Sequence, residues 1–136
     1  MAATTNRSQG SPSPKRILVA DDDAAFLTAM KTLLEREGYA VIDVPNGEEA
    51  LARCRRETVD LVITDLSMPK QDGMQLVDGL KALAKTTPVI VITAFGEWDT
   101  YAEAIGKGVV AYLDKPVKKD EVLQLVRAAL GASRPA

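Results

Sequence analysis

The sequence predicts an α/β protein, a three-layer α/β/α sandwich built around one five-stranded parallel sheet. From Lys15 onward, short apolar runs typical of strands alternate five times with segments that carry apolar residues at helical spacing. Strand–helix units repeated in this order place the strands parallel, because each helix crosses over right-handedly to the next strand. The chain has 136 residues, of which 46% are apolar and 26% charged, and these values are typical of one globular domain.

The five predicted strands are short apolar runs. They cover residues 17–20, 39–44, 59–64, 89–93 and 109–114. The third run is nearly continuous in apolar residues, which is typical of a strand buried on both faces.

The helices between these strands are predicted from apolar spacing and from capping residues. The first carries Phe26, Met30, Leu33 and Leu34 and ends near Gly38, and the others cover about 46–56, 73–84, 98–106 and the segment from 118 onward. We expect Asp23 to cap the first helix. Asn46, with Glu49 three residues later, is typical of a capping arrangement at the start of the second.

The two ends of the chain are predicted to lie outside the folded domain. Residues 1–14 are small, polar and rich in Pro, Gly and Ser, so we expect a disordered tail there. The domain is expected to cover 15–131, followed by a short C-terminal tail over 132–136. The N-terminus lacks an apolar signal-peptide core, and the longest apolar run covers only 109–113. A membrane span needs about 18 residues, so we expect a cytoplasmic protein without membrane contact.

Charge and composition exclude several kinds of chemistry. A formal net charge of −2 gives no indication of nucleic-acid binding. The chain has no histidine, which excludes Ser-His-Asp and Cys-His catalysis and most zinc or iron sites. The single cysteine, Cys54, is interpreted as an ordinary residue of a helix face rather than as an activated thiol. Reactivity must therefore come from carboxylates, lysines and hydroxyl groups.

Polar residues stand at the ends of four of the five predicted strands. They are Asp21, Asp22 and Asp23 after the first strand, Asp65 after the third, Thr93 at the end of the fourth, and Asp114 and Lys115 at the end of the fifth. In an open parallel sheet, ligands bind in the crevice beyond the carboxyl ends of the strands. We therefore expect these side chains to form one site.

Three carboxylates of this group are expected to lie close together, because the first and third strands are neighbours. Asp21, Asp22 and Asp65 would repel one another unless their pKa values rise or a cation binds. Mg²⁺ suits hard oxygen ligands of this kind, and with Lys115 it would make the site neutral. A phosphoryl group on Asp65 would then add about one negative charge, to which the hydroxyl of Thr93 could donate a hydrogen bond.

Four stretches of the sequence resemble the receiver domain of bacterial two-component response regulators. They are ILVADDD (17–23), LVITDLSMPKQDG (61–73), VIVITAFG (89–96) and YLDKPV (112–117). The resemblance covers essentially all of residues 15–131. It implies a flavodoxin-like receiver fold with strand order 2-1-3-4-5, and a cis peptide bond between Lys115 and Pro116.

The resemblance also implies how the acidic residues would act. Asp65 would accept a phosphoryl group from a histidine kinase or a histidine phosphotransfer protein. Asp22, Asp65 and the main-chain carbonyl of Ser67 would bind Mg²⁺ directly, and Asp21 would act through a water molecule. The protein would then be a phosphorylated switch with phosphotransfer and autodephosphorylation activity rather than a turnover enzyme.

The remaining implied roles concern catalysis and signalling. Lys115 and Thr93 would stabilise the transferred group, and Thr93 and Tyr112 would be the switch residues. The signal would appear on the surface formed by the helix 98–106, the strand 109–114 and the helix from 118. That surface would contact an output domain, a downstream protein or, after phosphorylation, a second copy of the chain.

Four of the six aromatic residues fall within or beside this surface, and they are Phe95, Trp98, Tyr101 and Tyr112. Aromatic residues are enriched at protein interfaces, which favours a binding role. Packing of Trp98 and Tyr101 inside the sandwich is an equally supported interpretation.

The lifetime of the phosphorylated state is expected to depend on Ser67 and Phe95, which lie two residues after Asp65 and Thr93. Ser67 is small and can hold a water molecule. Phe95 is bulky and offers no base, so we expect it to hinder the hydrolytic water and to make autodephosphorylation slow.

Three alternatives to a phosphorylated receiver remain open. An Mg²⁺-dependent phosphatase with an aspartyl-phosphate intermediate would favour an acid at the position of Ser67 and would need a cap domain. A flavodoxin-like electron carrier would need a Ser-, Thr- and Gly-rich loop where Asp21, Asp22 and Asp23 stand. A degenerate receiver used as a scaffold would have lost site residues, whereas all of them are present.

Overall fold

Five parallel strands form the central sheet of the protein, in the order β2-β1-β3-β4-β5. The computed structural model describes residues 14–68, 72–83, 85–94 and 96–132. The strands are β1 (Arg16–Ala20), β2 (Ala40–Val44), β3 (Leu61–Thr64), β4 (Val89–Thr93) and β5 (Ala111–Asp114). The helices are α1 (Ala24–Arg36), α2 (Gly47–Arg56), α3 (Gly73–Ala82), α4 (Trp98–Gly106) and α5 (Lys119–Ala132). The predicted fold class and strand order are therefore confirmed.

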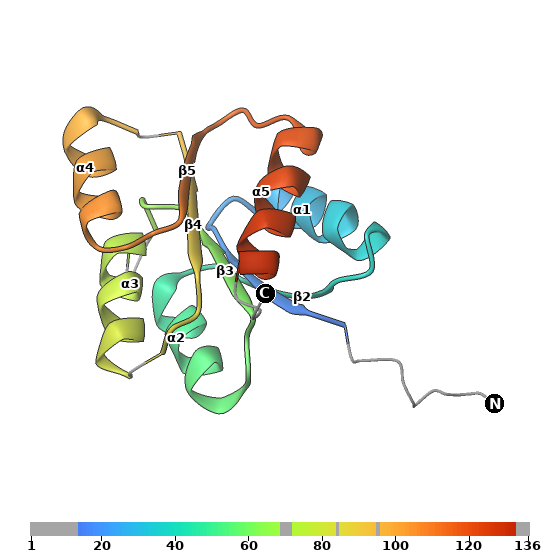
Figure 1. The fold of residues 1–136 in the computed structure, drawn as a ribbon, viewed down its shortest axis with the longest axis horizontal. Coiled ribbons are helices and arrows are strands. Elements are labelled where there is room, and N and C mark those ends of the chain that lie inside the picture. The colour runs from blue at the N-terminus through green and yellow to red at the C-terminus, as the bar shows by residue number, and fades with distance from the viewer. Residues whose placement is uncertain (1–13, 69–71, 84, 95, 133–136) are drawn as a thin grey trace.

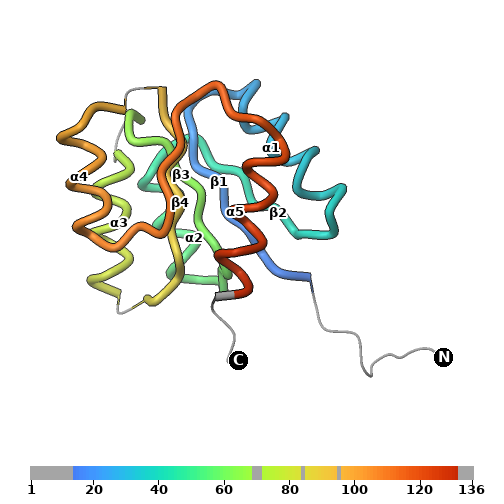
Figure 2. Tube along the Cα trace, turned by 45° about the horizontal axis from the view of Figure 1, so that its top comes forward, coloured from blue at the N-terminus to red at the C-terminus, as the bar shows by residue number. Residues whose placement is uncertain are grey.

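The helices cover both faces of the sheet. Helices α1 and α5 pack on one face and helices α2, α3 and α4 on the other (Figures 1 and 2). A hydrophobic core lies on each face of the sheet, and alternate residues of β1 pack into one or the other. Leu18 packs toward α2 and α3, while Ile17 and Val19 pack toward α1 and α5. All four residues of β3 are buried, as predicted for a central strand with helices on both sides.

The expected helix caps are present. The carboxylate of Asp23 accepts hydrogen bonds from the backbone N–H groups of Ala25 and Phe26 at the start of α1. Asn46 accepts from the backbone N–H of Glu49 at 2.8 Å, and its side-chain amide donates to the Glu49 carboxylate at 3.3 Å. These bonds fix where α1 and α2 begin, and α1 begins directly beside the aspartates that follow β1.

Three strands begin later than their apolar runs predict. β2 starts at residue 40 rather than 39, β3 at 61 rather than 59, and β5 at 111 rather than 109. Val109 is buried like a strand residue, but its N–H donates to the carbonyl of Ala104 and so closes the end of α4. Gly108 allows this turn because its φ of +93° is a conformation that favours glycine. Burial at Val59 and Val109 therefore extends beyond the ladders of β3 and β5.

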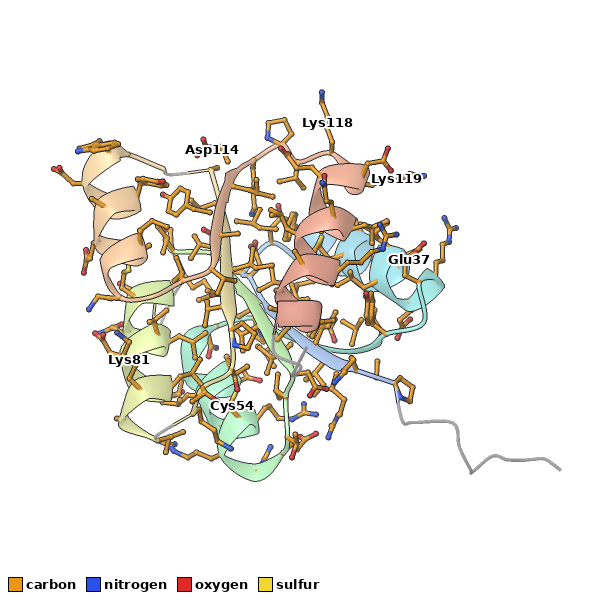
Figure 3. All side chains as sticks on the ribbon, in the orientation of Figure 1. Glu37, Cys54, Lys81, Asp114, Lys118 and Lys119 are labelled. Carbon is orange, nitrogen blue, oxygen red and sulfur yellow. The ribbon has the colours of Figure 1, made fainter. Side chains whose placement is uncertain are left out.

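Cys54 is buried within the core between α2 and the sheet, which agrees with its interpretation as a helix-face residue (Figure 3). Among the described residues, no helix is both long enough and apolar enough to cross a bilayer. Residues 1–13 and 133–136, which make up nearly all of the two expected tails, lie outside the described part of the chain.

Candidate functional site

Parallel pairing brings the ends of four strands to one edge of the sheet. Ala20 of β1 is paired with Thr64 of β3, and Thr93 of β4 is paired with Asp114 of β5. The residues that follow these positions, among them Asp21, Asp65 and Lys115, must emerge at the same edge. The crevice expected there is thus built by the backbone register.

Three carboxylates converge at this edge. Oxygen atoms of Asp21, Asp22 and Asp65 all lie within 4.8 Å of one another. Asp21 and Asp65 are buried, whereas Asp22 is exposed. Close, partly buried negative charges repel one another, so this arrangement favours the binding of cations.

Lys115 supplies positive charge to the cluster. Its Nζ donates to Oδ2 of Asp21 at 2.7 Å and to Oδ2 of Asp65 at 3.2 Å, and its side chain is only 17% exposed. Burial by itself would lower the pKa of Lys115, but the hydrogen bonds and charges of the two aspartates outweigh it and raise the pKa. The ammonium group therefore stays charged at neutral pH.

Burial has the opposite consequence for Asp21. It raises the pKa of the carboxyl group, and the nearby charge of Asp65 adds to this, while the hydrogen bonds from Lys115 and from the backbone N–H of Asp23 oppose it. Asp21 thus holds Lys115 in place, but burying the negative charge of the Asp21 carboxylate costs free energy. A second cation near Asp21 would reduce that cost.

The Asp65 carboxylate is held by hydrogen bonds to both of its oxygen atoms. Its Oδ1 accepts from the backbone N–H groups of Leu66 at 2.6 Å and of Ser67 at 3.2 Å, and its Oδ2 accepts from Lys115. Gly73, at the start of α3, packs so closely that a Cβ there would lie 2.3 Å from the main-chain oxygen of Asp65. Glycine at 73 therefore lets α3 approach the backbone at the end of β3.

Thr93 ends β4 and is fully buried at the same edge. Its carbonyl accepts a hydrogen bond from the backbone N–H of Lys115 at 2.9 Å. The bond between Lys115 and Pro116 is cis, as the resemblance implied. The β4 and β5 strand ends are thereby tied together next to the acidic cluster.

Tyr112 lies on β5 and faces α4. Its hydroxyl is 3.2 Å from Oγ1 of Thr100, and its ring makes an edge-on contact with Tyr101 at a centroid distance of 5.3 Å. Trp98 is 76% and Tyr101 39% exposed, so these two rings do not belong to the core of the sandwich. With Tyr112 they line a groove of about 380 Å³ at the start of α4.

Of the two residues expected to control dephosphorylation, the structure describes only Ser67. Ser67 is exposed beside Asp65, and its backbone N–H donates to the Asp65 carboxylate. Phe95 lies outside the described residues. The role of Phe95 stays a prediction.

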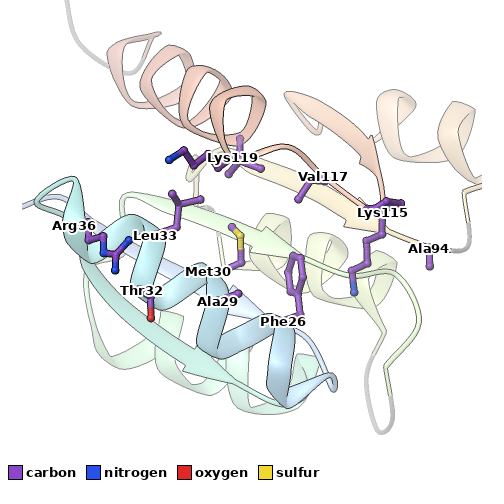
Figure 4. A pocket seen from close by; sticks show the side chains of 12 residues that line it. Phe26, Ala29, Met30, Thr32, Leu33, Arg36, Ala94, Lys115, Val117 and Lys119 are labelled. Atoms are coloured by element: carbon purple, nitrogen blue, oxygen red, sulfur yellow. The ribbon is translucent and has the colours of Figure 1, made fainter.

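One neighbour of Lys115 was not expected from the sequence. The ring of Phe26, on the first turn of α1, lies with its centroid 4.2 Å from Nζ of Lys115 (Figure 4). Both residues line a largely apolar cavity of about 860 Å³ between α1 and the start of α5. Helical spacing assigned Phe26 to the core. Its place three residues after the cap Asp23 was the available signal that it faces the acidic edge.

A family model for the response regulator receiver domain matches residues 17–127. The chain belongs to this family. It is 40% identical over 126 residues to the transcriptional regulatory protein GlrR of Escherichia coli, and 36% identical over 115 residues to the transcriptional regulatory protein ResD of Bacillus subtilis. These matches cover 93% and 85% of this chain, but only 28% of GlrR and 48% of ResD. The chain is therefore much shorter than these regulators.

Solved receiver domains have the same fold. A response regulator receiver domain protein from Methanospirillum hungatei superposes with a TM-score of 0.83 at 30% identity, covering 88% of this chain and 96% of that one. The receiver domain of the Francisella response regulator 1452 gives the same TM-score and identity, and is covered over 99% of its length. The receiver fold thus accounts for the parallel sheet and for the site edge.

Proposed function

We propose that this receiver domain is a switch in which Asp65 accepts a phosphoryl group from the phosphohistidine of a kinase or a phosphotransfer protein. The observation that carries this proposal is the environment of the Asp65 side chain. Its carboxylate is buried, oriented by two backbone N–H groups, and contacted by the ammonium of Lys115 at 3.2 Å. A nucleophile in phosphoryl transfer needs such a fixed position beside positive charge.

The donor set at this edge fits Mg²⁺. Among the described residues, three carboxylates within 4.8 Å of one another face the one ammonium group of Lys115, so negative charge is in excess there and hard oxygen ligands are available. Asp22, Asp65 and the main-chain carbonyl of Ser67 would hold the ion directly, and Asp21 would act through water. When bound, the ion would supply positive charge next to the phosphoryl oxygens.

The chain's own residues then divide the work of the transfer. An oxygen of Asp65 forms the new O–P bond while the P–N bond of the phosphohistidine breaks and the imidazole leaves with the electron pair. Lys115, already beside Asp65, stabilises charge on the transferred group. Thr93 is buried at the neighbouring strand end, where its hydroxyl is suited to bind the new oxygens.

Phosphorylation would be signalled through Thr93 and Tyr112. If Thr93 moves toward the phosphoryl group, Tyr112 can turn inward and change the surface of α4, β5 and α5. The exposed rings of Trp98 and Tyr101 on that surface support contact with an output domain, a downstream protein or a second copy of the chain. We propose that this domain acts in the cytoplasm and binds neither nucleic acid nor membranes directly.

Two features favour a phosphorylated receiver over the alternatives. First, Asp21, Asp22, Asp65 and Lys115 lie together at one edge of the sheet. A degenerate receiver used as a scaffold would not need to keep these residues. Second, Ser67 stands where an aspartyl-phosphate phosphatase favours an acid, so we propose a stoichiometric switch rather than a turnover enzyme. The lifetime of its phosphorylated state would depend on Ser67 and Phe95.

The test is labelling with a small phosphodonor such as phosphoramidate in the presence of Mg²⁺, followed by intact mass measurement. The wild-type protein should gain the mass of one phosphoryl group, and the gain should disappear when Mg²⁺ is chelated. Asp65→Asn should gain none, while Asp72→Asn, a change at the cap of α3, is the control that should label fully. An unlabelled wild type or a fully labelled Asp65→Asn would overturn the proposal.

A further inference from the structure

The aromatic ring of Phe26 contacts the ammonium group of Lys115. Nζ of Lys115 lies 4.2 Å from the ring centroid, and the side chain of Phe26 points from α1 toward the lysine (Figure 4). A cation this close to a ring face is attracted by the negative charge of the π-electrons. The partial burial of both side chains strengthens that attraction, because little water competes for the ammonium group.

Phe26 is itself fixed in place. Its backbone N–H donates to the capping carboxylate of Asp23 at 3.2 Å, which defines the first turn of α1. Its side chain packs against the core formed by α1, α5 and the sheet. The ring is therefore a rigid neighbour for a lysine whose own side chain has four rotatable bonds.

The ring of Phe26 differs from the two carboxylates that contact Lys115, because its charge does not change during phosphoryl transfer. Asp21 and Asp65 hold the ammonium group at 2.7 and 3.2 Å, but both belong to the cluster whose charge changes when a metal ion binds or when Asp65 is phosphorylated. Phe26 carries no charge and takes no part in these changes. Its attraction for Lys115 therefore does not depend on the charge of that cluster.

We propose that Phe26 is a positioning residue for the phosphorylation reaction, whose ring holds the Lys115 ammonium beside Asp65. The proposal rests on the proposed function of Asp65. A cation that is already in position stabilises the transferred phosphoryl group without first having to reorganise, and this raises the rate. Weakening the ring's attraction for Lys115 should therefore slow phosphorylation.

The test replaces Phe26 by phenylalanines that carry one, two and three fluorine atoms. Fluorine withdraws electron density from the ring face but changes its shape little, so a purely space-filling role is not affected. The rate of phosphorylation by phosphoramidate at saturating Mg²⁺ should fall stepwise and become about fivefold slower with three fluorines. Phe26→Leu should be slowed similarly, whereas Phe26→Trp should keep the wild-type rate.

The matched control is Leu33→Ala, which alters another wall of the same cavity and should leave the rate unchanged. Melting temperature and Mg²⁺ affinity of each fluorinated protein should equal those of the wild type. If the wild type labels normally and all fluorinated variants are phosphorylated at the wild-type rate, this inference alone is overturned. A wild type that does not label would overturn the proposed function and this inference together.

Discussion

The ammonium group of Lys115 donates a hydrogen bond of 2.7 Å to the buried carboxylate of Asp21, a residue 94 positions earlier in the chain. This bond joins the ends of β5 and β1 across the site edge. It also distinguishes two adjacent aspartates, because Asp21 is bonded to the lysine whereas Asp22 is exposed to solvent. The two carboxylates should therefore contribute differently to metal binding.

We predict that Asp22→Ala weakens Mg²⁺ binding by at least about tenfold, because a direct ligand is lost. Asp21→Ala should weaken it less, because we propose that Asp21 acts only through water, and its carboxylate already accepts a hydrogen bond from Lys115 at 2.7 Å. Calorimetric titration with Mg²⁺ measures both affinities. Asp23→Ala, which removes the α1 cap, is the control that should lower stability by about 1 kcal/mol and leave Mg²⁺ affinity unchanged. Equal affinity in the wild type and Asp22→Ala would contradict the assignment.

We predict that Thr100 restrains Tyr112. The Thr100 hydroxyl donates to the carbonyl of Glu97 at 2.9 Å, so Tyr112 is the donor in the 3.2 Å contact between the two hydroxyl groups. An inward turn of Tyr112 would break this bond, and Thr100→Val removes its acceptor in advance. Beryllium fluoride, a phosphoryl mimic, should therefore bind Thr100→Val about threefold more tightly in the presence of Mg²⁺.

Fluorescence of the exposed Trp98, which lines the same groove as Tyr112, can follow that titration. Thr100→Ser keeps the hydroxyl group and should bind the mimic like the wild type. If Thr100→Val also binds it with wild-type affinity, Thr100 does not restrain the switch.

Much of this site could be predicted because the strands of a parallel sheet all end at the same edge. Once the five strands are recognised, Asp21, Asp65 and Lys115 must emerge at one edge, whatever the details of packing. The contacts of Lys115 with Phe26 and of Tyr112 with Thr100 could not be predicted in this way. They depend on side-chain rotamers and on how far α1 and α4 tilt toward the sheet, and helical spacing gave only the face on which Phe26 lies.

The same limit explains the strand boundaries and the aromatic surface. Apolar runs show which residues are buried, but not which backbone groups join the ladder. The apolar run therefore predicts a strand at Val109, although the N–H of Val109 closes α4. Trp98 and Tyr101 have the spacing of a buried face, yet only the structure shows that α4 turns them toward solvent.

We predict that Cys54 is inert in the folded protein. Burial raises the pKa of its thiol, which the charge of Lys85 offsets only in part, so less thiolate is present near neutral pH than for a free cysteine. Reaction with an aromatic disulfide reagent at pH 8 should be at least about 100-fold slower in the native protein than in urea. Native reaction at the unfolded rate would show that the thiol is accessible.

The identity of the phosphorylated residue is the central claim, and borohydride trapping tests it most directly. Borohydride reduces an aspartyl phosphate to homoserine, which peptide mass spectrometry assigns to one position. After treatment with phosphoramidate and Mg²⁺, we predict homoserine at Asp65 and none at Asp21 or Asp22. Homoserine at either of those aspartates, or none at Asp65 in fully phosphorylated protein, would contradict the account.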